Sequence, residues 1–162
     1  MKSMHLTPMA AVLLGGFIAG TIDIGAASLI NWLSPIVILR AIASGLLGKA
    51  AFHEGVPAAL LGLGLQWAMG ILIAAIYMLG TYRFTRLRQR WIPMGVGYGA
   101  VILIVMNYVV VPLSAAPFKP SSDMLKIAEN LLAMILFGLI VAFFAQRAVA
   151  ATSMSTSAEG SV

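Results

Sequence analysis

Residues 9–33 read MAAVLLGGFIAGTIDIGAASLINWL, an apolar run with a single acidic side chain, Asp23, near its centre. A transmembrane helix needs about 20 predominantly apolar residues to cross a hydrocarbon core about 30 Å thick. A charged side chain at the centre of such a helix costs roughly 2.5–3.5 kcal/mol, so it usually has a partner or a function. The run therefore predicts a transmembrane helix and makes Asp23 its most informative residue.

The composition of the whole chain indicates a membrane protein. Of its 162 residues, 61% are hydrophobic and only 9% are charged, whereas soluble proteins carry about 25% charged residues. The apolar residues also fall in blocks of membrane-spanning length. We therefore predict an all-α, polytopic integral membrane protein. The chain has no cysteine, which excludes disulfides, thiol catalysis and cysteine-bound metals.

Four apolar blocks are predicted to cross the membrane: residues 9–33, 57–81, 92–113 and 124–146. They predict a four-helix bundle that forms a single transmembrane domain over residues 1–147. Residues 36–48 are also apolar but too few to cross, which favours a re-entrant or interfacial helix between the first two spans. Residues 148–162 are small and polar and predict a disordered cytoplasmic tail.

The basic residues predict the orientation of these spans. The connection between the second and third spans carries Arg83, Arg86, Arg88 and Arg90. Lys2 precedes the first span and Arg147 follows the fourth, and basic residues near span ends concentrate in the cytoplasm. Four spans place all these charges on one side, whereas a fifth span at residues 36–48 would separate Lys2 from the arginine cluster. We therefore predict that both termini are cytoplasmic.

The arginine cluster itself has a predicted partner. Cytoplasmic leaflets carry anionic lipids, which attract basic residues next to a transmembrane helix. We expect the four arginines to contact these lipid headgroups, and we expect no binding of nucleic acid.

The N-terminus has a second interpretation as a secretory signal peptide. Lys2 followed by apolar residues 9–20 has the charge and core of such a peptide. The apolar run continues past Asp23 to Leu33, beyond the usual core of about 7–15 residues, which favours a retained span.

Small residues recur every three or four positions along the spans, which places them on one face of each helix. Small side chains allow helices to approach closely in lipid. The glycines predicted to pack in this way are Gly16, Gly20, Gly62, Gly70, Gly95, Gly99 and Gly138. The same faces carry Asp23, Gln66 and Asn107, so these side chains are predicted to point into the bundle.

A polar site is predicted in the half of the bundle farther from the arginine cluster. Its candidate members are Asp23, Arg40, Gln66, Asn107 and Glu129. An ion pair of Arg40 with Asp23 or Glu129 would neutralise charge in a poor solvent. The alternatives are structural: a protonated or hydrogen-bonded Asp23, an Arg40 that reaches the headgroups, and a Glu129 paired with Lys126.

The sequence contains no pattern typical of a metal, nucleotide or cofactor site. His53 and Glu54 are adjacent, without the spacing of a zinc-binding helix. Phosphate-binding loops, nucleophile elbows and dinucleotide fingerprints are also absent. We therefore expect no metal and no cofactor.

Several short features mark the last third of the chain: Pro112-Leu113, Pro117 with Phe118, Glu129-Asn130 and a closing Arg147. Leu39-Arg40 after the first span is a further point. In these features the chain resembles the uncharacterised bacterial inner-membrane proteins of the YagU-like type. It departs from them in its shorter length and in lacking a long polar insert after the first span. The resemblance implies a small multi-pass protein of the bacterial inner membrane and supplies no catalytic residues.

Three functions are compatible with this sequence. The first is a non-enzymatic protein that moves a proton or small solute through Asp23, as a homodimer, or that supports envelope stress tolerance. The second is a structural or accessory subunit that packs against another membrane protein. The third is a membrane enzyme for a lipid or other apolar substrate, with Glu129 or His53 as acid or base. The scarcity of paired polar groups argues against the enzyme.

Overall fold

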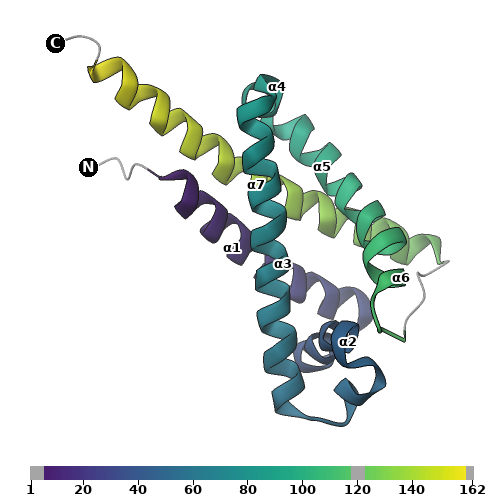
Figure 1. Cartoon of the computed structure of the whole chain (residues 1–162). Coiled ribbons are helices and arrows are strands. Elements are labelled where there is room, and N and C mark those ends of the chain that lie inside the picture. The colour runs from purple at the N-terminus through teal and green to yellow at the C-terminus, as the bar shows by residue number, and fades with distance from the viewer. Residues whose placement is uncertain (1–5, 118–122, 160–162) are drawn as a thin grey trace.

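The computed structural model describes residues 6–117 and 123–159, and within these ranges the chain is helical without any strand (Figure 1). The long helices are α1 (Pro8–Asn31), α2 (Pro35–Leu47), α3 (Val56–Arg83), α5 (Trp91–Val105) and α7 (Met124–Glu159). The short ones are η1 (Gly48–Phe52), α4 (Thr85–Gln89), η2 (Met106–Val110) and α6 (Val111–Leu113). The predicted all-α fold is confirmed.

Five helical stretches are long and apolar enough to cross a membrane, among the residues that the structure describes. They are Pro8–Asn31, Pro35–Phe52, Val56–Arg83, Trp91–Leu113 and Met124–Ala150. Four of them coincide with the predicted spans. The remaining stretch, Pro35–Phe52, is longer than expected, because the 3₁₀ turn η1 continues directly from α2 at Gly48. By length and composition, α2 with η1 therefore also qualifies as a span.

Prolines and a polar cap define where the helices begin. Pro8, Pro35 and Pro57 each occupy one of the first two positions of a helix, where the missing N–H removes no intrahelical bond. The side-chain oxygen of Thr7 accepts a hydrogen bond of 3.2 Å from the Ala10 N–H, which caps α1.

α1 and α3 run antiparallel. Gly16 of α1 lies against Gly70 and Ile71 of α3, whereas Gly20, one turn later, lies against Gln66. Residue numbers rise along α1 as they fall along α3, so the two helices point in opposite directions.

α5 and α7 form a second antiparallel pair. Gly95 lies against Ala142 and Gly99 against Met134 and Ile135. In Figure 1, α7 also runs beside α1 in the opposite direction, and thereby joins the two pairs. The core along this junction is rich in alanine, which lets the helices approach closely.

All seven predicted packing glycines lie at helix crossings. Gly16, Gly20 and Gly70 lie between α1 and α3, and Gly62 lies between α2 and α3. The other three, Gly95, Gly99 and Gly138, lie between α5 and α7. At Gly62 a Cβ would overlap the carbonyl oxygen of Leu39, so the backbones touch there.

A π-helical turn, η2, interrupts the third predicted span. The N–H of Val111 bonds the carbonyl of Met106, five residues earlier. Pro112, one residue further on, has no N–H and its ring would clash with the carbonyl four residues before it in a regular α-helix. The wider turn relieves this clash and keeps the helix continuous into α6.

The C-terminal end of α7 differs from the sequence prediction. We predicted disorder from residue 148, whereas α7 continues to Glu159. Ala148 and Val149 are buried in the same core cluster as Ala11 of α1. Packing against α1 thus accounts for the first residues of the extension. Residues 160–162 lie outside the described ranges.

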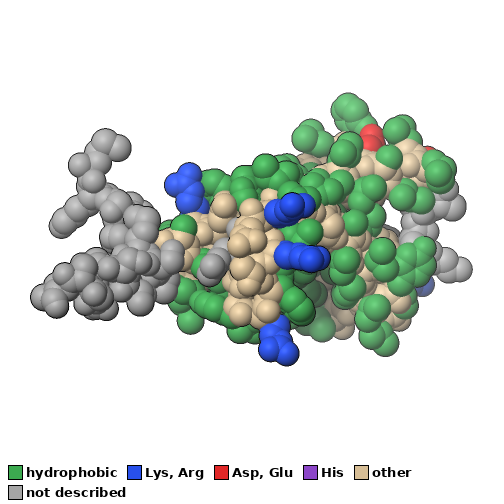
Figure 2. Space-filling model, turned by 90° about the horizontal axis from the view of Figure 1, so that it is seen from above, with side chains coloured by type: hydrophobic (Ala, Val, Ile, Leu, Met, Phe, Trp, Pro, Cys, Tyr) green, Lys and Arg blue, Asp and Glu red, His purple; other side chains and the backbone are tan. Residues whose placement is uncertain are grey.

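The two ends of the molecule differ in charge. The start of α1, the end of α7 and α4 lie in the upper part of Figure 1, whereas α2 and α6 lie in the lower part. The segment after α6 returns to α2, where the Ala115 N–H bonds the Gly45 carbonyl at 2.9 Å. Arg83 ends α3 and Arg86 lies on α4 in the upper part of Figure 1, and Figure 2 shows the blue basic side chains mainly across the middle and left of the face in view.

Candidate intramembrane polar site

Asp23 and Gln66 form a hydrogen-bonded pair between α1 and α3. The Gln66 Nε2 donates to Asp23 Oδ2 at 2.7 Å and also to the Gly20 carbonyl at 3.3 Å. Both side chains are half-buried. The close approach of the helices at Gly16 and Gly70, one to two turns away, brings the short carboxylate within reach of the amide.

A second polar contact lies beside this pair. The indole N–H of Trp67 donates to the Thr21 hydroxyl at 3.2 Å, and the ring of Trp67 contacts that of Phe17 at a centroid distance of 4.6 Å. The Thr21 hydroxyl in turn donates to the Phe17 carbonyl at 2.8 Å. Two consecutive residues of α3, Gln66 and Trp67, therefore each donate a hydrogen bond to α1.

Arg40 does not join Asp23. Its Nε donates to the carbonyl of Gly55 at 3.0 Å, and Gly55 is the residue that precedes α3 with a φ of 68°. This bond ties α2 to the start of the next helix. In the described part of the chain, Arg40 forms no ion pair with Asp23 or with Glu129, so the predicted charge pairing is not present.

The other two predicted members also lie apart from the pair. Asn107, in the π turn, donates to the Leu103 carbonyl of its own helix at 2.9 Å. Glu129 is half-buried on α7 and forms no ion pair with Lys126 among the residues described. Of the five predicted site residues, the structure thus brings together only Asp23 and Gln66.

The Asp23–Gln66 pair supports a narrow range of chemistry. Only Oδ2 of the carboxylate accepts a hydrogen bond from another described residue, so Oδ1 retains its acceptor capacity. No His, Asp or Glu beside it completes a metal-binding group within the described ranges. The pair could hold two helices together or bind a proton, but it lacks the nucleophile and base of a hydrolytic site.

Two tyrosines that the sequence reasoning did not single out link α3 to the following helices. Tyr98 of α5 donates to the Ile73 carbonyl at 2.8 Å, and Tyr77 donates to the Leu87 carbonyl of α4 at 3.3 Å. Their rings meet edge to face at 4.9 Å. The sequence could have predicted these contacts from the position of each tyrosine inside an apolar span. A buried tyrosine hydroxyl needs a hydrogen-bond acceptor, which a neighbouring helix can supply.

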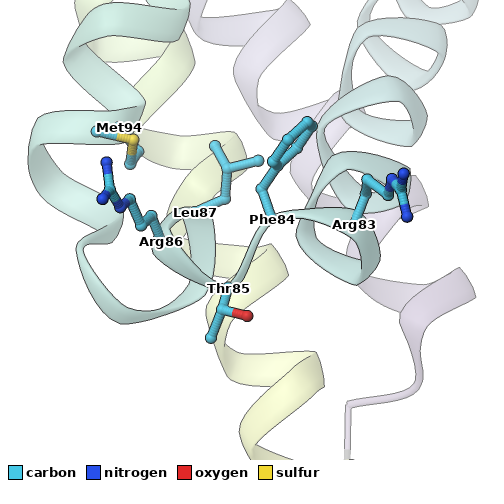
Figure 3. A pocket seen from close by; sticks show the side chains of 6 residues that line it. All are labelled: Arg83, Phe84, Thr85, Arg86, Leu87 and Met94. Carbon is cyan, nitrogen blue, oxygen red and sulfur yellow. The ribbon is translucent and has the colours of Figure 1, made fainter.

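The predicted headgroup-binding arginines lie around the connection between α3 and α5. Arg83 ends α3, Arg86 lies on α4 and Arg90 follows it, and all three side chains are exposed. The side chain of Arg88 lies outside the part that the structure describes. Figure 3 shows a pocket in this region, lined by Arg83, Phe84, Thr85, Arg86, Leu87 and Met94.

The apolar helices indicate a membrane protein. Comparison with protein-family models, with curated proteins and with solved structures found no match.

Proposed function

We propose that this chain is a structural or accessory component of the bacterial inner membrane, with four spans and no enzymatic activity. The observation that carries the proposal is the Gln66–Asp23 hydrogen bond beside the closest crossing of α1 and α3. It gives the one acidic group in the first span a partner that holds two helices together. The inner-membrane location rests on the resemblance to YagU-like proteins.

The antiparallel order of α1 and α3 supports four spans. If α2 with η1 crossed the membrane completely, α1 and α3 would enter from opposite sides and run parallel. Their contacts have the opposite order, with Gly16 beside Gly70 and Gly20 beside Gln66. A re-entrant or interfacial α2 is compatible with this order, since it returns the chain to the side on which α1 ended.

The position of the basic residues supports cytoplasmic termini. Arg83, Arg86 and Arg90 lie at the end of the molecule that also holds the start of α1 and the end of α7. Basic residues beside spans favour the cytoplasm.

The dispersal of the predicted polar site favours a structural role over transport. Arg40 bonds the backbone before α3, and Asn107 bonds its own helix. A pathway for a solute needs several polar groups around one cavity, and these groups do not converge.

Proton transfer through Asp23 is the second candidate, because its Oδ1 accepts no hydrogen bond from the described residues. Proton flux into liposomes separates the two functions. Purified wild type and Asp23→Asn would be reconstituted, and acidification would be followed with an internal pH-sensitive dye under a potassium diffusion potential.

The structural proposal expects both proteins to give the flux of empty liposomes. Flux above that level in the wild type, lost in Asp23→Asn, would contradict it and support proton transfer. The structural role also predicts that cross-linking in native membranes couples the protein to another membrane protein. Recovery as a lone species after cross-linking would contradict an accessory role.

A further inference from the structure

Two side-chain oxygens beside the crossing of α1 and α3 have no hydrogen-bond donor. The Gln66 Nε2 directs both of its hydrogen bonds at α1, to Asp23 Oδ2 and to the Gly20 carbonyl. No residue in the described ranges donates to Asp23 Oδ1 or to Gln66 Oε1. Over the same ranges, the only buried side-chain oxygen or nitrogen without a partner is the Ser28 Oγ. The two acceptors are therefore not buried, and a donor from outside the chain can reach them.

The hydrogen bond from Gln66 leaves the negative charge of Asp23 without a positive partner. Asp23 lies eight residues before the end of α1, about 12 Å along the helix, so it is well inside a hydrocarbon core about 30 Å thick. Ionisable side chains at such a depth usually pair with one another or with backbone carbonyls. The site thus lacks the cation that an acidic residue in this position needs.

The basic residues of α2, η1 and α3 lie far from this depth. The guanidinium of Arg40 bonds the carbonyl of Gly55, eleven residues before Gln66 and therefore about 16 Å from it along the direction of α3. Lys49 lies in η1, which packs near the start of α3. Arg83 is the last residue of α3, about 25 Å from Gln66 along the helix. None of these cations is level with the carboxylate.

The basic residues of α7 also lie at other depths. Phe144 contacts Gly15 of α1, which precedes Asp23 by eight residues. Because α1 and α7 are antiparallel, the part of α7 that is level with Asp23 lies about eight residues before Phe144. Lys126 and Arg147 are each at least ten residues from that level, about 15 Å along the helix. A second copy of the chain in the same orientation has these cations at the same depths, so it cannot supply the missing charge either.

We propose that Asp23 Oδ1 and Gln66 Oε1 bind a lysine or arginine side chain in the membrane-spanning helix of a different protein. A basic head group carries several donors and no acceptor, so one group can bond both oxygens and neutralise the carboxylate. Its long apolar stem lets the charge reach between packed helices. The inference rests on the proposed accessory function and adds the chemistry by which the partner is recognised.

Two designed transmembrane peptides would test the proposal. Each has a core of about 20 leucines and identical polar ends, and one peptide carries a single lysine at the centre of the core. Energy transfer from the labelled peptide to the protein labelled at Ser34→Cys would measure binding in phosphatidylcholine vesicles. We expect the lysine peptide to bind at least about tenfold more tightly than the all-leucine peptide, because a hydrogen bond to a charged group contributes about that factor or more. Oriented circular dichroism would verify that both peptides span the bilayer.

Two variants assign the preference to one carboxylate. Asp23→Asn keeps an oxygen for the Gln66 amide but has no charge, so its preference for the lysine peptide should fall below about twofold. Glu129→Gln removes the other acidic charge of the described apolar spans and should retain the preference of the wild type. Thermal unfolding of both variants in detergent would verify that they are folded.

Equal binding of the two peptides by the wild type would overturn the proposal. An undiminished preference in Asp23→Asn would do the same, and a preference lost only in Glu129→Gln would place the cation on α7 instead. These failures differ from a failure of the accessory function. Proton flux in liposomes would contradict that function, whereas an absent lysine preference would leave an accessory protein whose partner binds elsewhere.

Discussion

The hydrogen bond from Gln66 offsets part of the energetic cost of placing the Asp23 carboxylate inside an apolar helix. An acidic side chain in lipid needs a partner, and the nearest donor is a neutral amide on α3 rather than a cation. Arg40 satisfies a different requirement, because it bonds the carbonyl that precedes α3. Each polar side chain of the predicted site thus has a local structural task except Glu129, for which the structure gives no explanation.

Replacing Asp23 should lower the stability of the protein only if the new side chain has no oxygen that can accept the hydrogen bond from Gln66. Asp23→Leu leaves the Gln66 amide without its side-chain partner, and a hydrogen bond between membrane helices is worth about 0.6 kcal/mol on average and up to about 1.7 kcal/mol. Asp23→Asn keeps an oxygen for that amide and should stay within a few tenths of a kcal/mol of the wild type. Unfolding in detergent micelles would measure both variants.

Equal stability of Asp23→Leu and Asp23→Asn would contradict this assignment. It would mean that the hydrogen bond between α1 and α3 contributes nothing to holding them together.

At the scale of the helices, glycine determines where backbones meet. Gly62 lies against the Leu39 backbone of α2, whereas a Cβ on Gly64 would have no atom within 4 Å. Both glycines lie in α3, and both belong to the same apolar stretch of sequence. Spacing alone therefore does not separate a glycine that packs from one that does not.

This difference gives a matched pair of substitutions. Gly62→Ala should destabilise the protein by about 1–3 kcal/mol, because the added methyl overlaps a backbone carbonyl that can move only with its helix. Gly64→Ala should be neutral or stabilising by up to about 1 kcal/mol, since alanine favours the helix. The apparent melting temperature of each detergent-solubilised variant would show the difference.

If both alanine variants lost stability equally, the crossing of α2 and α3 would not lie at Gly62. The corresponding pair on α5 is Gly99 and Gly97, of which only Gly99 contacts α7. Repeating the comparison there would establish whether the result is specific to α2.

At the scale of the whole molecule, α2 decides the topology. The chain has no native cysteine, so a single introduced cysteine reports its own accessibility without background. Ser34 and Glu54 flank α2 and η1, and both are exposed, as is Gln89 next to the arginine cluster. Four spans place Ser34 and Glu54 on the outer face and Gln89 in the cytoplasm.

Labelling with a membrane-impermeant maleimide would test this arrangement in spheroplasts. We expect Ser34→Cys and Glu54→Cys to react before lysis, and Gln89→Cys to react only after it. Protection of Glu54→Cys together with reaction of Ser34→Cys would mean that α2 crosses the membrane and that the chain has five spans.

The sequence alone determined the helical class, the four main apolar stretches and the glycines that could pack, since these follow from length, hydropathy and residue size. It also identified Asp23 and Gln66 as residues of inward faces. Only the tertiary structure decided that these two side chains meet, and that Arg40, Asn107 and Glu129 stay apart from them. The reason is that hydropathy and periodicity fix a residue's depth and face along its own helix, whereas contacts between helices depend on their direction, rotation and crossing point. The helical extension beyond Arg147 has the same origin, because the burial of Ala148 and Val149 depends on α1, far away in the chain.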